Sequence, residues 1–563
     1  MTASNSVANG SSKPAAPNRA AELAELIDAV KALVVPFVQE ADNAFDERAA
    51  GGPAGASTAD LPVRTALVES LTPQQVVPRL DLQLPTGEGG GRAALLALVQ
   101  RVLQLSVNTW DQGFLDKLYA STTPVGVAAE LLLSVLNTNL HVFQVSPALS
   151  VIEKTTAREL ARLYGFTGPR AGGVTCAGGS ASNFTSVVIA RNTLYPETKV
   201  HGNGAGRRFA LFTSAHGHYS VEKAAQAAGL GSGAVWTVPV DAAGCMVPAK
   251  LESCIAAATA AGMTPLYVNA TAGTTVMGSY DPFEAVSAIC KAHGLWMHID
   301  GSWGGPAIFS AAHRHKMAGS HLADSLTVNP HKMMNVPVTC SFLLGPDLRI
   351  FHRANTLPAG YLFHTTPDAK KKRKGNDGAA VEEPVEEGQE KTEEDEKEDE
   401  KEEEEDDDGE DSEPEVWDLA DLTLQCGRHG DSLKLALAWV YEGAAGFERQ
   451  TDHAFAMAAL LADTIASKPD VFALVSTNPP PCLQVCFYYA DATAGAGQPS
   501  TDAAVNTRRT REAVARLIRR GFMIDFAPGQ HGSFFRVVLN WQTRPGTVQG
   551  LVRALELVRK EVM

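Results

Sequence analysis

The chain lacks several features that would place it in a special class of protein. Its eight cysteines are scattered without a Cys-x-x-Cys pair, so we expect neither a disulfide framework nor a metal site, and reduced thiols indicate a cytoplasmic location. No apolar run is long enough to cross a bilayer, which argues against a membrane partner. Residues 1–20 lack the basic start and the apolar stretch of a secretory signal, and their composition predicts a disordered tail.

A net excess of basic charge is also absent. The net charge is −16, but residues 381–415 alone hold 23 acidic residues and only three lysines, so this one segment accounts for the whole excess. A basic run, 370–374 (KKKRK), stands just before it, and outside these two blocks the chain is nearly neutral. Nothing in this balance indicates a nucleic-acid partner. Because residues 366–415 are too highly charged to bury a core, we predict a disordered insertion there.

The apolar pattern divides the 563 residues into three regions. Helical spacing predicts an N-terminal helical domain at 21–150, and a smaller C-terminal α+β domain is expected at 431–563. Between them, at 151–430, short apolar runs alternate with helical stretches, which predicts an α/β domain with a mostly parallel sheet and ligands bound beyond its strand ends. The predicted strands of this large domain are 209–213, 265–269, 295–300, 325–329 and 339–344.

Some predicted elements have well-marked limits. One helix of the large domain can be capped by Asp281, has Pro282 in its first turn and can end at Gly294. The elements expected in the small domain are an amphipathic helix at 505–520 and strands at 483–489 and 534–540.

A lysine follows the strand predicted at 325–329. It is Lys332, within the sequence Asn329-Pro330-His331-Lys332-Met333-Met334. Burial at the end of a strand would lower the pKa of this ammonium group, and a neutral lysine amine can form a Schiff base with an aldehyde cofactor. A lysine at such a position is often only a surface residue that closes a loop, so the interpretation depends on other features of the chain.

Two of these features fit a pyridoxal phosphate site. Asp300 ends a predicted strand, where a buried carboxylate could keep a pyridine nitrogen protonated, and small residues such as Ser302 follow it and leave room for a flat ring. A glycine-serine turn that contains Ser180 and Ser182 opens a predicted helix, an arrangement typical of phosphate binding. Taken singly, each of these is also common as an ordinary turn.

An aromatic side chain should cover one face of such a ring. His218 lies at the start of a predicted helix and is well placed to stack, with His216 as a competing candidate. A lone histidine is usually structural, so this position gains its meaning from the combination with Lys332 and Asp300.

In combination and in this order, the motifs resemble the group II pyridoxal-phosphate-dependent amino acid decarboxylases, over residues 108–556 apart from the charged insertion. Further segments resemble, more narrowly, the animal-type glutamate and cysteine sulfinate decarboxylases of that family. The segments that carry the resemblance are 137–139 (NTN), 178–183 (GGSASN), 218–220 (HYS), 270–275 (ATAGTT), 299–300 (ID), 329–332 (NPHK), 360–363 (GYLF), 425–429 (QCGRH) and 534–536 (FFR).

The resemblance implies a fold-type-I large domain like that of aspartate aminotransferase, a helical N-terminal segment, a small α+β C-terminal domain and a homodimer with its site at the subunit interface. It implies that Lys332 holds the cofactor covalently, that Asp300 pairs with the ring nitrogen and that His218 stacks on the ring. The full implied set of cofactor-binding residues is Lys332, Ser180, Ala181, Ser182, His218, Thr271, Asp300, Ser302, Asn329 and His331.

The resemblance also implies residues that act on the substrate. Tyr361 would give a proton to the α-carbon after carbon dioxide leaves, and Arg536 would bind a substrate carboxylate with its planar fork of donors. Asn139, Lys117 and His141 would line the substrate pocket. A lysine and a histidine replace the glutamine and the aromatic residue usual in the animal-type glutamate enzymes, so we expect a more cationic pocket.

These features predict an α-decarboxylase of an L-amino acid, with an acidic substrate: glutamate first, then cysteine sulfinate or aspartate. An aromatic amino acid is the alternative, and Arg536 and Asn139 argue against it. Oxidative deamination usually accompanies loss of the loop tyrosine, and Tyr361 is present. A non-catalytic binding protein that uses the acidic insertion to recruit basic partners is the alternative from another class.

Overall fold

The computed structural model describes residues 18–69 except 50–66, then 71–357 except 205, and 415–563. Nearly all of the predicted tail and insertion, together with Tyr361, therefore lies outside the described residues. Among the described residues no helix is both long and apolar enough to cross a membrane, and no three or more His, Cys, Asp or Glu side chains are grouped as a metal site.

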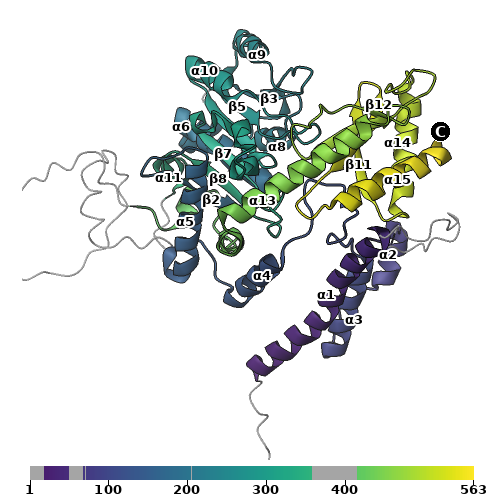
Figure 1. Ribbon diagram of the computed structural model, residues 1–563. Helices are drawn as coiled ribbons and strands as arrows, with labels where there is room; N and C mark the ends of the chain where they lie inside the picture. Colours follow the sequence, from purple (N-terminus) through teal and green to yellow (C-terminus); the bar gives the residue numbers. More distant parts are fainter. Residues whose placement is uncertain (1–17, 50–66, 70, 205, 358–414) are drawn as a thin grey trace, which may run out of the picture.

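A seven-stranded sheet forms the centre of the large domain (Figure 1). Its order is β2-β8-β7-β6-β5-β3-β4, and the strands from β7 to β4 run parallel, while β8 is antiparallel to both of its neighbours. This confirms the predicted α/β class with a mostly parallel sheet. The strands are β2 (Gly172–Cys176), β3 (Phe209–Ser214), β4 (Val235–Val238), β5 (Thr264–Thr271), β6 (Trp296–Gly301), β7 (Ser325–Val328) and β8 (Ser341–Gly345).

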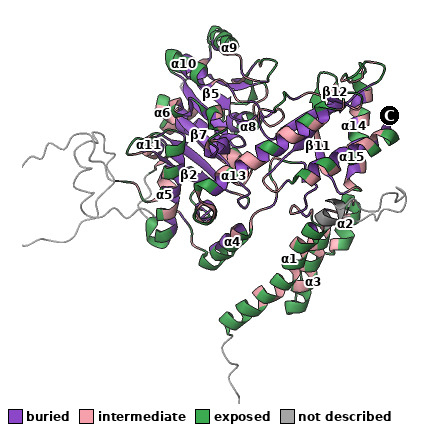
Figure 2. Ribbon diagram, in the orientation of Figure 1, coloured by how far each residue is buried: buried purple, intermediate pink, exposed green. Residues whose placement is uncertain are grey.

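Helices flank this sheet and bury its strands, as Figure 2 shows by the purple of the strands. One of them, α10, ends at Gly294 as predicted, but Asp281 does not cap it. The carboxylate of Asp281 instead accepts the backbone N–H groups of Met246 and Thr271, so this part of the prediction is wrong. The helices of this region are α5 (Pro147–Leu163), α6 (Gly179–Leu194), α7 (Thr198–His201), α8 (Ser220–Ala227), α9 (Pro248–Ala260), α10 (Phe283–His293) and α11 (Leu348–Asn355).

A second sheet, of five strands, belongs mainly to the C-terminal part of the chain. Its edge strand β1 comes from the N-terminal part and pairs in parallel with β11, so the two ends of the chain meet in one sheet. The long helix α13 (Ser432–Ala466) leads from the large domain into this part and is kinked at Gly443. The other elements are β1 (Phe114–Leu115), β9 (Phe472–Leu474), β10 (Gln484–Tyr489), β11 (Met523–Gly529), β12 (Gly532–Val538), α14 (Ala503–Ile518) and α15 (Pro545–Val562).

The N-terminal helices project from the rest of the molecule (Figure 1). Helices α1 (Arg19–Ala49) and α3 (Gly91–Leu105) lie side by side, and neither α2 (Pro73–Leu80) nor α3 contains a buried residue. A separate helix, α4 (Pro124–Leu136), packs against α13 and leaves one side in solvent. The domain boundaries at 20/21, 150/151 and 430/431 stay predictions.

The residues on either side of segment 358–414 contact each other. The side-chain amide of Asn355 donates to the carbonyl oxygen of Leu422 at 3.1 Å, and the Thr356 hydroxyl donates to a carboxylate oxygen of Asp421 at 2.7 Å. The Glu415 carboxylate lies 2.8 Å from the amine of Lys154 on α5. Residues 355–356 and 421–422 are therefore neighbours in the fold.

Candidate active site

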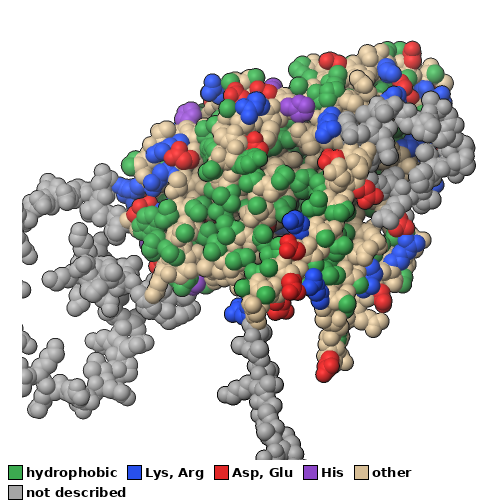
Figure 3. Space-filling view, turned by 60° about the horizontal axis from the view of Figure 1, so that its bottom comes forward, with side chains coloured by type: hydrophobic (Ala, Val, Ile, Leu, Met, Phe, Trp, Pro, Cys, Tyr) green, Lys and Arg blue, Asp and Glu red, His purple; other side chains and the backbone are tan. Residues whose placement is uncertain are grey.

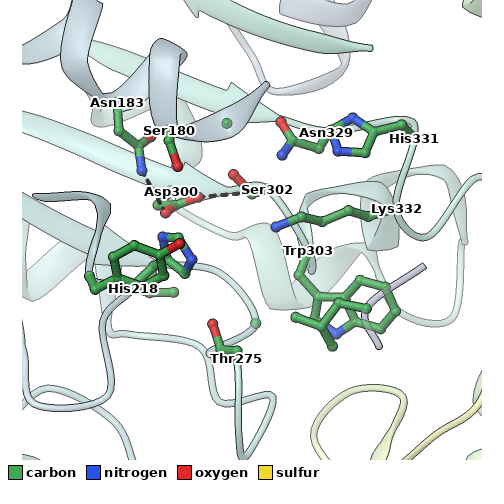
Figure 4. A pocket seen from close by; sticks show the side chains of 15 residues that line it. Ser180, Asn183, His218, Thr275, Asp300, Ser302, Trp303, Asn329, His331 and Lys332 are labelled. Carbon is green, nitrogen blue, oxygen red and sulfur yellow. Dashed lines mark hydrogen bonds between the residues drawn. The ribbon is translucent and has the colours of Figure 1, made fainter. Parts of the chain in front are cut away.

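A pocket of about 250 Å³ lies at the carboxyl ends of β5, β6 and β7. Thr271 ends β5, Asp300 comes from β6, and Asn329 and Lys332 follow β7, so neighbouring strands deliver their polar residues to one edge of the sheet. Figure 4 shows the Lys332 amine directed into this pocket, with Asp300, Ser302 and Asn329 around it. The predicted strand ends thus meet in space, as expected for parallel strands.

Burial sets the protonation of the two main charged groups on the pocket floor. It lowers the pKa of Lys332 below the usual value for a lysine, although Asp300 acts in the opposite direction. Burial would raise the pKa of Asp300, but Lys332 and the donors from Ser302 and Asn183 outweigh it, so this pKa is below its usual value. The site therefore favours an ionised aspartate beside a lysine that loses its proton readily.

Two N–H donors fix the Asp300 carboxylate. One oxygen accepts the backbone N–H of Ser302 at 3.1 Å, and the other accepts the side-chain amide of Asn183 at 2.8 Å (Figure 4). Asp300 is only 4% exposed, so water does not compete for these contacts. Its direction in the pocket is therefore set by the protein.

One end of the pocket offers donors suited to an anion. Helix α6 begins at Gly179, so its first N–H groups have no partner within the helix and point out of its N-terminus. Gly179 and Ser180 both line the pocket. A side chain at position 179 would not fit, because a Cβ atom there would lie 2.5 Å from Nδ2 of Asn329 and 2.7 Å from Oγ of Ser302. The backbone can approach a ligand closely at this point.

The predicted phosphate residues divide into two groups. Ser180 and Asn329 line the pocket, whereas Ala181 and Ser182 do not. The buried Ser341 hydroxyl donates to Oδ1 of Asn329 at 2.6 Å and must therefore accept from Ser182, whose hydroxyl is 2.7 Å away. The Ser182 hydroxyl thus donates to Ser341 on β8, and it orients Asn329 only through Ser341.

The predicted stacking residue faces the same pocket. His218 lines it and His216 does not, which separates the two competing candidates geometrically. Nδ1 of His218 accepts the backbone N–H of Ser220 at 3.2 Å, and burial lowers the pKa of the ring, so the imidazole is held in place and neutral. His331 also lines the pocket, and burial lowers its pKa to about 4.

Arg536 and Lys117 lie together beyond Thr275, which lines the pocket. Arg536 donates from Nη1 to the carbonyl oxygen of Thr275 at 3.0 Å and from Nη2 to Asp525 at 2.6 Å. Lys117 contacts the same Asp525 oxygen at 2.8 Å and Asp116 at 3.2 Å. These two cations therefore already face two carboxylates, which differs from the freely cationic pocket that the sequence suggested.

Asn139 and His141 lie away from the Lys332 pocket in this chain. Asn139 lines a second pocket, of about 430 Å³, together with residues of α4 and the segment that contains Arg428. Its side-chain oxygen accepts the backbone N–H of Arg428 at 2.9 Å, and the carbonyl oxygen of His141 accepts the N–H of Ala420. The single chain does not bring either residue to the Lys332 pocket.

Sequence reasoning missed several residues of the site. Asn183 was read only as part of the glycine-serine turn, yet it contacts Asp300. Trp303 lines the pocket and donates to the side chain of Gln484 at 3.0 Å, which in turn donates to the carbonyl oxygen of Thr274 at 3.0 Å. The second sheet thus supports one wall of the pocket. No local pattern signals such a contact between distant segments.

The residues present fit pyridoxal phosphate. Thr271 lines the pocket, and its hydroxyl is buried without a hydrogen-bond partner among the described residues, so a group of a bound ligand could satisfy it. The helix N-terminus at Gly179 suits a phosphate, the ionised Asp300 suits a protonated ring nitrogen, and the readily deprotonated Lys332 suits an aldehyde.

Comparisons with known proteins agree with this site. The model of the pyridoxal-dependent decarboxylase conserved domain matches residues 73–373. The chain is 52% identical to an L-aspartate decarboxylase of Metarhizium robertsii over 546 residues, which is 97% of this chain and 98% of that protein. It is 33% identical to human cysteine sulfinic acid decarboxylase over 471 residues, 83% of this chain and 85% of that one.

Solved structures give the same result for the fold. The crystal structure of mouse CSAD superposes with a TM-score of 0.78 at 29% identity, covering 96% of this chain and 99% of that one. A rice TDC structure with PLP and tryptamine superposes with a TM-score of 0.77 at 21% identity, over 97% of this chain and 99% of that one. The predicted fold is therefore confirmed.

Proposed function

The chain belongs to the pyridoxal-dependent decarboxylase family, and on that premise we propose that it removes the α-carboxyl group of L-aspartate. The broader activity, pyridoxal-phosphate-dependent decarboxylation of an amino acid, follows from the family. The choice of aspartate is carried by the similarity, over nearly the whole length, to an L-aspartate decarboxylase. For this reason we rank aspartate ahead of glutamate and cysteine sulfinate, whereas the sequence motifs alone ranked glutamate first.

The floor of the pocket would hold the cofactor. When bound, pyridoxal phosphate accepts the electrons that remain on the substrate as carbon dioxide leaves. Burial leaves the Lys332 amine able to bind an aldehyde covalently, and Asp300 would keep the ring nitrogen protonated. His218 would cover one face of the ring.

The other predicted cofactor contacts follow the lining of the pocket. Ser180, Asn329 and the backbone at Gly179 would bind the phosphate. Ser182 would contribute through the orientation of Asn329, and Ala181, whose N–H donates to the carbonyl oxygen of Gly178, through the first turn of α6. Thr271, Ser302 and His331 border the remaining edge of the ring space. Each would hold the cofactor in one orientation, which decides the bond that reacts.

The other side of the pocket would recognise the substrate. Arg536 and Lys117 are the cations close enough to meet a carboxylate, and Asp525 would hold both side chains until the substrate arrives. Tyr361, outside the described residues, is proposed from the resemblance to give a proton to the α-carbon and to exclude water. An acidic side chain fits these cations better than an aromatic one.

We also propose a homodimer. The apolar side chains Val127, Leu131, Leu132, Val135 and Leu136 of α4 are between 42% and 57% exposed. Figure 3 gives a view of the face that holds α4, where hydrophobic side chains form a broad area. Such an area supports an interface between subunits. Because the second pocket borders α4, a second copy could bring Asn139 and His141 to a substrate site.

A double change, Leu131→Glu with Val135→Glu, is the corresponding test. Light scattering should give a dimer for the wild type and a monomer for the variant, with lower activity. A monomeric and fully active wild type would refute the dimer. For location we propose the cytoplasm, because all eight cysteines are free. No nucleic-acid partner is proposed, since the chain outside 370–415 is nearly neutral.

Carbon dioxide release from five amino acids tests the substrate. Purified protein saturated with pyridoxal phosphate is assayed with aspartate, glutamate, cysteine sulfinate, tyrosine and tryptophan. We expect the highest kcat/KM with aspartate and none above background with the aromatic amino acids. The Lys332→Ala variant is the control for carbon dioxide release that does not depend on the proposed cofactor lysine. A higher kcat/KM for glutamate or for an aromatic substrate would overturn the proposal.

A further inference from the structure

A row of buried polar side chains leads away from Asp300, and among its other members only Asn183 lines the pocket. Trp296, His298 and Asp300 alternate along β6, so all three point to the same face of the sheet. On the neighbouring strand, Ser325 is the residue directly paired with His298. Asn183 reaches the group from helix α6. Of these residues, only Asp300 has a proposed role so far, and Asn183 has been described only as a contact of Asp300.

These side chains are connected without a break. Nε1 of Trp296 lies 2.9 Å from the Ser325 hydroxyl, and that hydroxyl lies 2.8 Å from Nδ1 of His298. Nε2 of His298 lies 3.2 Å from Oδ1 of Asn183, and Nδ2 of Asn183 lies 2.8 Å from Asp300. His298 and Ser325 are completely buried, and Asn183 is 1% exposed. Water therefore cannot replace any of these contacts.

The direction of each bond can be derived from its end at the carboxylate. An ionised aspartate only accepts, so Asn183 must turn its NH₂ group toward Asp300, and that group also donates to Ser220 at 2.9 Å. The remaining atom of the amide, Oδ1, is an acceptor, and it faces Nε2 of His298. Nε2 must therefore carry the ring proton.

The other half of the chain follows from the indole. Trp296 can only donate, so Ser325 accepts from it. His298 is fully buried, which lowers its pKa to about 4, and a neutral ring with its proton on Nε2 leaves Nδ1 as an acceptor. The Ser325 hydroxyl then donates to Nδ1. All four bonds point the same way, toward Asp300.

We propose that Trp296, Ser325, His298 and Asn183 form a one-way hydrogen-bond chain that positions Asp300 and holds it ionised against the ring nitrogen of the cofactor. Aligned bonds in a buried site polarise one another, by about 10–30% per bond, so the donors at the far end strengthen the last one. These are positioning residues, and none of them touches the reacting atoms. The proposal rests on the pairing of Asp300 with the ring nitrogen proposed above, and does not depend on which amino acid is the substrate.

Two measurements that need no substrate test the chain. Each variant is loaded with pyridoxal phosphate labelled with ¹⁵N in the ring, and the ¹⁵N chemical shift reports whether the ring nitrogen is protonated. The dissociation constant of the cofactor is measured on the same proteins. The variants are His298→Phe, Ser325→Ala and Asn183→Asp, and Asp300→Asn serves as the reference for a lost pairing.

We expect a graded response. Asn183→Asp places a second carboxyl group against Asp300 and should raise the dissociation constant about 10- to 100-fold, while His298→Phe and Ser325→Ala should raise it about 3- to 10-fold. In all three the ¹⁵N shift should move toward that of Asp300→Asn. Ser150→Ala is the matched control, because it removes a buried hydroxyl bond, to the carbonyl oxygen of Ser146, that involves no member of the chain. It should leave the shift unchanged.

The outcomes separate the two levels of the proposal. A shift in Asp300→Asn equal to that of the wild type would refute the pairing itself. If the ¹⁵N shift changes in Asp300→Asn but stays at the wild-type value in His298→Phe and Ser325→Ala, the hydrogen-bond chain is refuted and the pairing of Asp300 with the ring nitrogen is not. If His298→Phe does not fold, the smaller Ser325→Ala change and the tautomer of His298 in the wild type decide. A wild-type proton on Nδ1 of His298 would overturn the proposal directly.

Discussion

The charged groups on the floor of the pocket, Lys332 and Asp300, are stabilised differently from those of the Arg536 side, which comprises Arg536, Lys117 and Asp525. On the floor, Asp300 is 4% exposed and is held by N–H donors whose positions are set by β6 and α6. Beyond Thr275, the Lys117 side chain is 50% exposed and that of Asp525 is 22% exposed, and the charges there pair with each other. Fixed dipoles in a dry site keep one protonation state, whereas partly solvated ion pairs can exchange partners.

The comparison suggests a division of labour. The buried floor would determine the chemistry that the cofactor performs, and the Arg536 side would determine which amino acid is accepted. Changes on the floor should then affect kcat or cofactor binding for every substrate alike. Changes around Arg536 should affect KM for acidic substrates above all.

The largest effect is expected at Lys332. The Lys332→Ala change removes the only group proposed to bind the cofactor covalently, and should lower kcat by roughly 10⁴-fold or more, the scale observed when an enzyme loses its nucleophile. Steady-state decarboxylation is the measurement. Lys316→Ala is a control, since this partly buried lysine does not line the pocket. Substantial activity in Lys332→Ala would refute the role of the floor.

His298 provides a prediction for stability. Burial lowers its pKa from 6.5 to about 4, so between these values the unfolded chain binds a proton that the folded protein does not. The contribution of the neutral ring is therefore fully present above pH 6.5 and is lost as the pH falls toward 4.

Urea unfolding of the wild type and of His298→Phe, each at several pH values, measures this. The difference between their free energies of unfolding should be largest near neutral pH and should shrink on acidification by up to about 3 kcal/mol. A difference that stays constant with pH would mean that folding does not change the pKa of His298.

Arg536 is the test of the other side. Replacing it with methionine keeps an unbranched side chain but removes the guanidinium group and its charge, and should raise KM for an acidic substrate about 10- to 100-fold with a smaller change in kcat. Arg511→Met is the matched control, since Arg511 stacks over Phe526 in the same domain. An equal loss for acidic and aromatic substrates would contradict a role in selection.

The smallest effect is expected at the phosphate end. Gly179→Ala should weaken cofactor binding about 10-fold, because the new methyl group would lie within 3 Å of Asn329 and Ser302. Gly233→Ala is a fitting control, since nothing lies within 4 Å of a Cβ atom at that position. Equilibrium dialysis of the cofactor would compare the two. Unchanged binding in Gly179→Ala would mean that the phosphate does not approach this glycine.

Much of the fold was predictable because it depends on local pattern. Short apolar runs between helices gave the parallel strands β3, β5, β6 and β7, and their ends gave Asp300 and Lys332. The direction of β8, which is antiparallel to β7, depends on the return path of the chain and has no local signal. Asp281 was wrongly expected to cap α10, because two backbone groups from other segments compete for its carboxylate.

The site was only partly predictable for the same reason. The spacing of Trp296, His298 and Asp300 along one strand is visible in the sequence, but their partner Asn183 lies 117 positions from Asp300. Likewise, Arg536 could be chosen by its motif, while nothing marked Asp525 as the carboxylate that pairs with it. Residue types indicate what a site can do, and long-range packing decides which of them cooperate.

The contacts between Asn355 and Leu422 and between Thr356 and Asp421 have a practical consequence. A stretch of chain whose two ends are fastened side by side can change in length at little cost, because closing a longer loop adds only about 0.6 kcal/mol for each doubling. The segment between Thr356 and Asp421 is therefore a suitable insertion site for protein engineering. A fluorescent reporter or an affinity tag could be inserted there without strain on the residues at either end.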